Sequence, residues 1–234
     1  ANNEDDMSYD ECGDDLNRLC ENIESFRGDT GKALSMISDD GFFFEVKENY
    51  GPEMVTAFIR LNGMTVGCVA NRTEVLDEEN EKTAEYEPVL GARGCDKAAE
   101  FVSFCDAFNI PVLALVNVKG YKQSKCTERR IAKAAGRLTY AFANADVPKV
   151  TVVIGEAYGS AYVTMNSKSI GADIVYAWPD AKIGMMDAAA AVKIMYAEEI
   201  SASDKAAALI SEKAAEYEAL QSSAAAAAGR GYVD

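Results

Sequence analysis

Residues 147–187 constrain the fold of this chain more than any other stretch. They begin with a β-branched run over 150–154, which is typical of a buried strand, and we expect that strand to end at Gly155. Small residues over 159–161 then open a segment with helical spacing that continues to about Lys168. The pattern predicts a strand, a tight turn and the start of a helix.

Such a turn has a chemical use, because the first N–H groups of a helix have no partner inside it. The helix dipole adds positive potential at the same place, and small side chains let a ligand oxygen come close. The turn at Gly159, Ser160 and Ala161 can therefore form an oxyanion hole. The same small residues are also typical of a helix that packs closely on a strand, and the local pattern leaves both interpretations open.

Histidine is absent from all 234 residues of the chain. This excludes Ser-His-Asp catalysis, Cys-His catalysis and histidine metal sites. The six cysteines include no C-x-x-C pair, and we expect no metal site and no dense disulfide framework. Cys68 and Cys105 lie in apolar patterns that predict buried thiols. Chemistry must therefore come from backbone dipoles, carboxylates, tyrosines, lysines or a cofactor's own groups.

Acidic residues outnumber basic ones and give the chain a net charge of −15. Nine acidic residues lie within residues 1–26, where Arg18 is the single cation. This balance argues against nucleic acid or anionic lipid as a partner. Because no run of 18 apolar residues occurs, membrane insertion is not expected either. We expect a cytoplasmic protein with a flexible acidic segment over residues 1–14, followed by one domain over residues 15–234.

Short strands alternate with helices along the chain, which predicts an α/β fold with a repeated ββα-like unit. The expected helices cover 14–26, 30–37, 97–108, 128–143, 188–200 and 206–227. The expected strands cover 42–46, 54–61, 64–70, 111–117, 150–154, 174–177 and 182–185. Asp29 is placed to cap a helix, and Asn62-Gly63 is a strong hairpin signal. Residues 71–94 are polar and acidic, which favours an excursion or mobile loop.

Several stretches resemble the C-terminal half of the carboxyltransferase subunit of biotin-dependent acyl-CoA carboxylases and decarboxylases. They are ADVPKVTVVIGEAYGSAYVTMNSK, GADIVYAWPDAKIGMMD, AVKIMYAEEI, ISDDGFFFEV, VGCVANRT and KAAEFVSFCDAFNIPVLAL. The resemblance extends from about Asp15 to Asp234. It implies a crotonase-like superhelix of stacked ββα turns, as a single domain with peripheral helices and without the family's last helix.

The resemblance also implies roles for the residues of the turn. In the family, the backbone amides of the second and third turn residues hold the ureido oxygen of biotin; here these are Ser160 and Ala161, after Gly159. The Ser160 hydroxyl either contacts the ligand or caps the helix. Val163 matches the position that lines the acyl pocket, although an ordinary core role is also open.

Three further residues are expected near biotin. Tyr158 and Tyr162 flank the turn and are expected to shape the biotin slot. Gly120 is the one residue that matches a Pro-Gly-Phe turn of the family, and the chain departs from the family pattern on both sides of it. Lys119 and the polar run after Tyr121 replace that pattern, and the lysines there either meet a carboxylate or phosphate or form a solvated basic loop.

Carboxyl transfer between carboxybiotin and a short-chain acyl-CoA, such as acetyl- or propionyl-CoA, is the implied activity. Its direction stays open between carboxylation, decarboxylation and transcarboxylation. The implied partners are a CoA-binding N-terminal half, a biotin carboxyl carrier protein and identical subunits. Two alternatives remain at this point: a non-catalytic assembly domain, and a stand-alone crotonase-like acyl-CoA hydrolase or isomerase.

Overall fold

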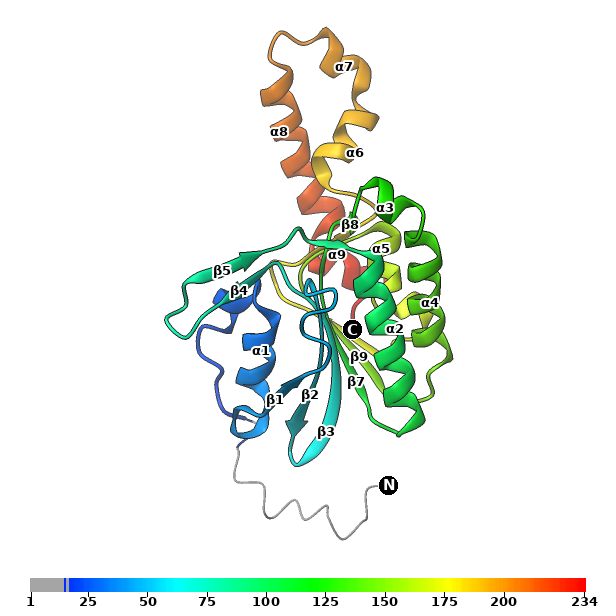
Figure 1. The fold of residues 1–234 in the computed structure, drawn as a ribbon. Helices are drawn as coiled ribbons and strands as arrows, with labels where there is room; N and C mark the ends of the chain where they lie inside the picture. The colour runs from blue at the N-terminus through cyan, green and yellow to red at the C-terminus, as the bar shows by residue number, and fades with distance from the viewer. Residues whose placement is uncertain (1–14, 16) are drawn as a thin grey trace.

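Within the described residues, seven strands form one mixed sheet, and helices cover both of its faces (Figure 1). This computed structural model describes residue 15 and residues 17–234. The strand order is β1-β2-β3-β7-β9-β10, and β11 pairs with the last residues of β9. The strands are β1 Phe43–Glu45, β2 Met54–Leu61, β3 Met64–Asn71, β7 Val112–Val118, β9 Lys149–Tyr158, β10 Ile174–Ala177 and β11 Lys182–Gly184.

Strand β2 is antiparallel to its neighbours β1 and β3, whereas β3, β7, β9 and β10 run parallel. The carboxyl ends of the parallel strands therefore lie along one edge, where ligands bind in many α/β proteins. Two short ladders lie outside the main sheet. They are β4 Glu74–Leu76 with β5 Lys82–Glu85, and β6 Val89–Leu90 with β8 Gly120–Tyr121.

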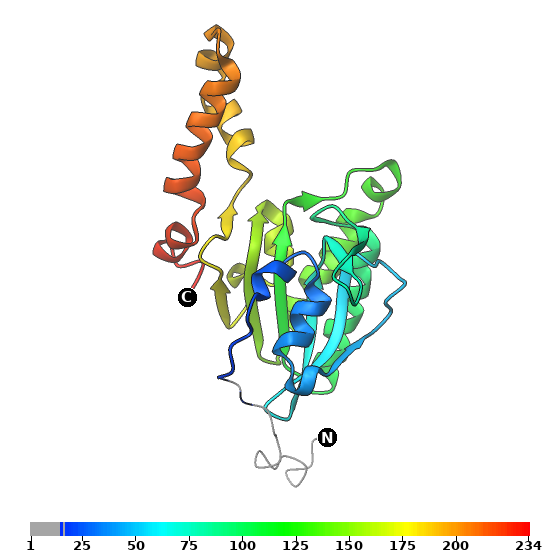
Figure 2. The same cartoon turned by 90° about the vertical axis from the view of Figure 1, so that its left-hand side faces the viewer.

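Helix α1 (Thr30–Ile37) lies on one side of the sheet, and α2 (Ala92–Ala107) with α4 (Ile131–Asn144) lies on the other (Figure 1). Helices α6 to α8 form an arm that stands away from the sheet, as Figure 2 shows from the side. The remaining α-helices are α3 Lys125–Glu128, α5 Gly159–Thr164, α6 Ala188–Met195, α7 Ala197–Ala202, α8 Ala206–Tyr217 and α9 Ala224–Gly229. Short helical turns are η3 Ile23–Phe26, η4 Asp39–Gly41, η5 Lys168–Ile170 and η6 Glu218–Ser222. Across the described part of the chain, no helix combines the length and apolar character needed to cross a membrane.

The alternation of side chains along β3 shows how the two faces are built. Cys68 and Ala70 belong to a cluster that includes Leu34 of α1, whereas Val69 between them belongs to the larger cluster under α2 and α4. Successive strand side chains point to opposite faces, so both faces of a half-parallel sheet become buried. Cys68 and Cys105 are fully buried, as predicted, and burial raises the pKa of the Cys105 thiol to about 12.

Two local signals in the sequence are confirmed. The Asp29 carboxylate accepts a hydrogen bond of 3.1 Å from the N–H of Lys32 and caps α1. Asn62 and Gly63 both have positive φ, at 52° and 78°, and connect β2 to β3 in a two-residue hairpin. Both residues therefore adopt the conformation that this turn requires.

Three expectations about local structure are wrong. Strand β9 does not end at Gly155 but continues to Tyr158, because its last residues pair with β11. No helix fills the described part of residues 14–26 beyond η3; Asn22, the residue before η3, is left-handed with φ 60°, which an α-helix through this position does not allow. Residues 71–94 are not a mobile loop; they form β4, β5 and β6 before α2 begins at Ala92, and the β4–β5 ladder is an excursion from the main sheet.

Three expected helices have different extents. Residues 128–143 contain the end of α3 and then α4, and residues 188–200 divide between α6 and α7. The segment over 206–227 contains α8, the π-helical turn η6 and part of α9. The expected flexible segment over residues 1–14 lies outside the described residues.

A buried amide network joins the carboxyl ends of β3, β7 and β9. Asn117 lies at an irregularity in β7, and its N–H donates to Asn71 Oδ1 at 2.9 Å, while the Asn71 amide donates back to the Asn117 carbonyl. The Asn117 Oδ1 accepts the N–H of Glu156 at 3.0 Å. A Cβ on Gly155 would lie 2.5 Å from the same Oδ1, so only glycine fits beside the network.

We expect Gly155→Ala to destabilise the fold by about 1–3 kcal/mol, because it drives a methyl group into the Asn117 amide. Gly136→Ala is the matched control, since a Cβ there meets nothing within 4 Å in helix α4. The control should stabilise by up to about 1 kcal/mol. Urea unfolding of both variants measures the difference, and equal effects would contradict the packing argument.

Candidate functional site

Strand β9 passes into helix α5 without an intervening loop, and Gly159 makes this possible. Its φ is +59°, a left-handed conformation that costs other residues about 1–2 kcal/mol. A Cβ at this position would also lie 3.0 Å from the carbonyl oxygen of Met185. Glycine is therefore required here both by the backbone angle and by the close approach of the neighbouring chain.

The turn presents two backbone donors. Among the described residues, no hydrogen bond is found for the N–H of Ser160 or of Ala161. The N-cap of α5 is Tyr158, which supplies no side-chain bond, and Ser160 is an exposed residue inside the helix. The interpretation of the Ser160 hydroxyl as a helix cap is therefore wrong, because Ser160 is the second residue of α5 and lies two positions after the N-cap.

Tyr121 fixes the orientation of the second donor. Its hydroxyl donates to the carbonyl of Ser160 at 3.1 Å and lies 2.9 Å from the hydroxyl of Thr164. Thr164 also donates to the Ser160 carbonyl at 3.0 Å. Because a peptide unit is planar, anchoring the Ser160 carbonyl also fixes the direction of the Ala161 N–H.

Val163, Tyr162 and Tyr158 lie on the inner side of the turn. Val163 and Tyr162 line a 460 Å³ cavity that also reaches β11 and the C-terminal helices. The Tyr162 hydroxyl is buried without a hydrogen-bond partner among the described residues, and burial raises its pKa to about 12. Tyr158 is 3% exposed, and burial raises its pKa as well. Both tyrosines are thus neutral, largely apolar walls and not acid–base groups near neutral pH.

Gly120 differs from Gly159 in what surrounds it. It lies in β8, and a Cβ placed there would meet nothing within 4 Å. The fold therefore does not require glycine at this position. The free space above it leaves room for a ligand that approaches the backbone.

The charged groups close to the turn neutralise each other. Lys119 Nζ lies 2.9 Å from Glu156 Oε2, and the Glu156 side chain is only 28% exposed. The Glu156 carboxylate is thus already engaged by a cation, which makes it a poor candidate for a general base. Asp187 accepts the N–H of Ala190 at 3.0 Å and caps α6.

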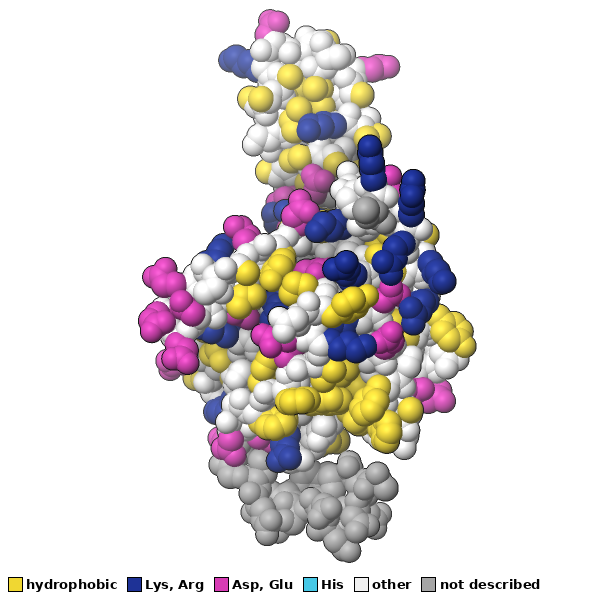
Figure 3. Space-filling model, viewed as in Figure 1, with side chains coloured by type: hydrophobic (Ala, Val, Ile, Leu, Met, Phe, Trp, Pro, Cys, Tyr) yellow, Lys and Arg dark blue, Asp and Glu magenta, His cyan; other side chains and the backbone are white. Residues whose placement is uncertain are grey.

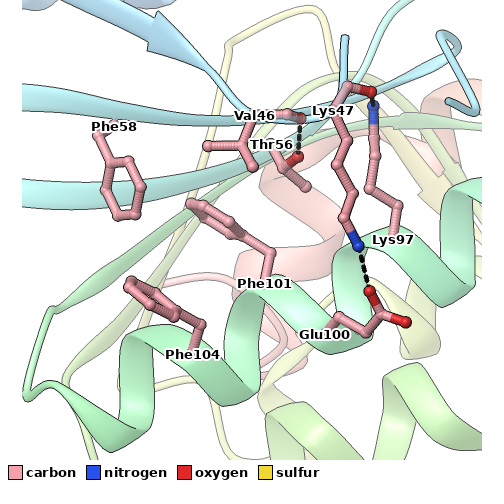
Figure 4. Close-up of a pocket in the computed structure, with 8 residues that line it drawn as sticks. All are labelled: Val46, Lys47, Thr56, Phe58, Lys97, Glu100, Phe101 and Phe104. Carbon is pink, nitrogen blue, oxygen red and sulfur yellow. Dashed lines mark hydrogen bonds and ion pairs between the residues drawn. The ribbon is translucent and has the colours of Figure 1, made fainter. Parts of the chain in front are cut away.

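Another cavity, of 360 Å³, lies between β2 and α2 and shares no lining residue with the turn (Figure 4). Phe58, Phe101 and Phe104 form its apolar wall. Lys97 is 1% exposed, donates to the Lys47 carbonyl at 3.2 Å, and has its pKa lowered to about 8 by burial. Lys47 pairs with Glu100 at the opposite wall, so the cations here already have partners.

The sequence pattern does not reveal three contributors to the site. The sequence position of Tyr121 gives no sign that its hydroxyl reaches α5. Asn117 ends one predicted apolar strand and Asn71 directly follows another, and a polar residue at both places is the available signal. Across residue 15 and residues 17–234, no group of three or more His, Cys, Asp or Glu residues is arranged to hold a metal ion.

Comparison with known proteins identifies relatives over most of the chain. Residues 10–234 match the carboxyl transferase domain family. The chain is 41% identical over 207 residues to the 12S subunit of methylmalonyl-CoA carboxyltransferase from Propionibacterium freudenreichii subsp. shermanii, covering 88% of this chain and 38% of that subunit. It is 37% identical over 231 residues to the alpha subunit of methylmalonyl-CoA decarboxylase from Propionigenium modestum, covering 95% of this chain and 43% of the relative.

Comparison with solved structures leads to proteins of the same kind. A crystal structure of transcarboxylase 12S with methylmalonyl-CoA and methylmalonic acid bound superposes with a TM-score of 0.82 at 37% identity, covering 96% of this chain and 42% of that chain. The beta subunit of Pseudomonas aeruginosa geranyl-CoA carboxylase superposes with a TM-score of 0.71 at 24% identity, which supports the fold alone. The expected crotonase-like α/β fold is thereby confirmed.

We expect Gly159→Ala to lower stability by about 1–2 kcal/mol, because a positive φ is unfavourable for alanine and its Cβ would crowd the Met185 carbonyl. Gly120→Ala is the matched control and should change stability by less than about 0.5 kcal/mol, since its Cβ points into open space. Thermal unfolding of both variants tests the contrast. A Gly159→Ala variant as stable as the parent would show that the turn tolerates other backbone conformations.

Proposed function

The chain belongs to the carboxyl transferase domain family, and on this premise we propose that it is the biotin-binding half of an acyl-CoA carboxyltransferase. In this role, it takes part in moving a carboxyl group between carboxybiotin and a short-chain acyl-CoA. When bound, carboxybiotin supplies the carboxyl group itself. The protein's task is to orient the cofactor and stabilise charge on its ureido oxygen.

The observation that carries this proposal is the turn at the end of β9. It offers the N–H groups of Ser160 and Ala161, with no competing acceptor found among the described residues. Gly159 sets the turn, and Tyr121 fixes the peptide plane of the Ala161 donor. Two preorganised amides directed at one oxygen make up an oxyanion hole, so the residues present fit the ureido group of biotin.

The other predicted site residues take supporting roles in this proposal. Gly120 leaves space for the cofactor next to the segment that holds the turn. Tyr158 and Tyr162 are buried apolar walls that keep the turn in place. Val163 lines a cavity with Met185 and is proposed as a wall of the acyl pocket.

The chain spans only 38% and 43% of the length of the two relatives described above, so the complete activity is assigned to a larger assembly. We propose a CoA-binding half, a biotin carboxyl carrier protein and further copies of the subunit as partners. The arm supports this, because it exposes large apolar side chains in the described structure. Examples are Ile194 and Met195 of α6, which are 69% and 62% exposed.

The alternatives receive less support from the site. A pure assembly domain has no need for two free amides, one of which a tyrosine holds in position. A stand-alone hydrolase or isomerase needs acid–base carboxylates, and Glu156, three residues before Gly159, is paired with Lys119. Neither argument depends on the direction of carboxyl transfer, which the proposal leaves to the complete enzyme.

A reconstituted assay tests the oxyanion assignment. The chain is mixed with the CoA-binding half of a carboxyltransferase, biotin and methylmalonyl-CoA, and biotin-dependent loss of the carboxyl group is followed. Ser160→Pro removes one N–H and should lower the rate by about 10²-fold or more. Ser160→Ala is the matched control: it keeps the N–H, loses only the hydroxyl, and should retain most of the rate.

Circular dichroism and thermal unfolding establish that both variants remain folded. A well-folded Ser160→Pro complex that keeps the parent's rate would sink the oxyanion assignment. A loss in Ser160→Ala as large as that in Ser160→Pro would instead assign the Ser160 hydroxyl to the ligand. Turnover by the chain alone, without the CoA-binding half, would favour the stand-alone enzyme.

Tyr121 is proposed as a positioning residue, and Tyr121→Phe tests this. The variant loses the hydroxyl that anchors the Ser160 carbonyl, so biotin-dependent activity should fall about tenfold while the stability decreases by only about 1 kcal/mol. Biotin KM should rise together with the fall in kcat, because the orientation of the donor is disturbed. A loss of stability without any change in either constant would restrict Tyr121 to a structural role.

A further inference from the structure

A polar cavity of 360 Å³ lies where the β1–β2 loop meets the start of α2 and the segment around α3. Three cations line it, Arg93, Lys122 and Arg130, against the single carboxylate of Glu53. This is a local reversal of charge in a chain with a net charge of −15. Figure 3 shows dark blue side chains gathered over this part of the molecule.

The three cations are only weakly engaged within the described structure. Arg93 lies 5.9 Å from the ring centre of Tyr50, and no ion pair is found for it or for Lys122 among the described residues. Arg130 lies 3.6 Å from Asp96, but that carboxylate makes the closer contact, 2.7 Å, with Arg137. The Arg130 side chain is 61% exposed. All three charges therefore remain available to an anion.

Backbone and hydroxyl donors add to these charges. Helix α2 is 16 residues long and begins beside the cavity, and Gly91 at its N-cap supplies no side-chain bond. Among the described residues, no partner is found for the N–H groups over 92–94. Ser124 and Thr127 contribute hydroxyl groups to the opposite wall. Donors of these kinds suit an anion with several oxygens.

The wall formed by the β1–β2 loop is anchored by a buried arginine. Arg72 is 6% exposed and makes two hydrogen bonds to the Glu45 carboxylate, at 2.9 and 3.1 Å. Its Nε donates to the Pro52 carbonyl at 2.6 Å, and its backbone N–H donates to the Glu53 carbonyl at 2.9 Å. The cavity wall is therefore held in a fixed position, which lowers the cost of ordering a ligand there.

Glu53 limits which anions suit the cavity. Its carboxylate lies close to the start of α2, where a Cβ on Gly91 would be 2.5 Å from Glu53 Oε1. With one negative group on the wall, the three cations leave an excess of two positive charges. A doubly charged phosphate fits this excess better than a single carboxylate, and arginine forks match phosphate oxygens in pairs.

We infer that this cavity binds a phosphate-bearing ligand through Arg93, Lys122, Arg130 and the start of α2. The site is separate from the turn, yet Lys122 directly follows the Tyr121 that holds the turn. The phosphate belongs either to a coenzyme A ester or to a free phosphate ester. The inference rests on the cavity alone and stands whether or not the chain takes part in carboxyl transfer.

Titration of the 234-residue chain with inorganic pyrophosphate tests the inference. Calorimetry should give saturable binding of one equivalent, and amide NMR signals of Ala92 and Arg93 should shift. Arg93→Gln, Lys122→Gln and Arg130→Gln should each weaken binding by about three- to tenfold. Glu53→Gln removes the opposing charge and should tighten binding by a similar factor.

Lys193→Gln is the matched control, because it removes one exposed cation from helix α6, outside the cavity. It should leave the dissociation constant unchanged within about twofold. Absence of saturable binding would overturn the inference. So would a loss in the control equal to that in the three cavity variants, since binding would then follow net charge alone.

Coenzyme A and adenosine 3′,5′-bisphosphate identify the source of the phosphate. If either binds more tightly than pyrophosphate and is weakened by the same three variants, the inference is supported with coenzyme A as the source. If pyrophosphate binds and both nucleotides fail to compete with it, the inference is supported with a free phosphate ester as the source. Nucleotide binding that none of the cavity variants changes, together with no pyrophosphate binding, would overturn it.

Discussion

The carboxamide of Asn117 is the interaction on which the geometry of the site depends. It lies where β7 loses its regular register and accepts the N–H of Glu156 in β9, while the backbone N–H and carbonyl of the same residue exchange hydrogen bonds with the Asn71 carboxamide in β3. Without that acceptor, the buried end of β9 would carry an unpaired N–H, which costs about 1–3 kcal/mol. The same carboxamide forces glycine at 155. The direction in which β9 approaches the turn is therefore set by a polar contact and not by apolar packing.

Charged groups are arranged differently near the turn and near the β1–β2 loop. Next to the turn, Lys119 and Glu156 cancel each other, so the backbone donors of α5 act without a competing side-chain charge. Near the β1–β2 loop, Arg72 and Glu45 are buried together, and burial raises the pKa of Glu45 despite the arginine. That pair stabilises the loop at Pro52. The exposed cations around the nearby cavity are thus presented on a rigid frame within an acidic protein.

Predictions from the sequence were correct where an interaction joins neighbouring residues and failed where it joins residues far apart in the chain. Signals confined to a few neighbouring residues, such as the Asp29 cap and the Asn62-Gly63 hairpin, were correct. The strand predicted to end at Gly155 was wrong, because its continuation depends on pairing with β11 about 30 residues later. The residues of the turn were found from the sequence, but their assigned roles remain proposals.

Contacts between distant segments could not be read from the pattern. Tyr121 reaches Ser160 across 39 positions, and the cationic cavity combines three separate segments of the chain. The family resemblance supplied the fold, which α/β periodicity alone would not have distinguished. The resemblance gave no information about the cationic cavity. The cations of that cavity lie where the chain departs from the family pattern, or on helices whose packing neighbours the sequence does not identify.

Exposure of the turn gives a physical reason for the covering partner proposed above. Ser160 lies at the surface, and in water two unit charges 4 Å apart attract by only about 1 kcal/mol, against about 4 kcal/mol at an effective dielectric constant near 20. Two backbone donors that remain open to solvent therefore supply little of the stabilisation that an oxyanion requires. A covering body that excludes water would strengthen the same donors without moving them. Met185 is 81% exposed, and its backbone passes close to Gly159, so at least one large apolar side chain near the turn is open to such a cover.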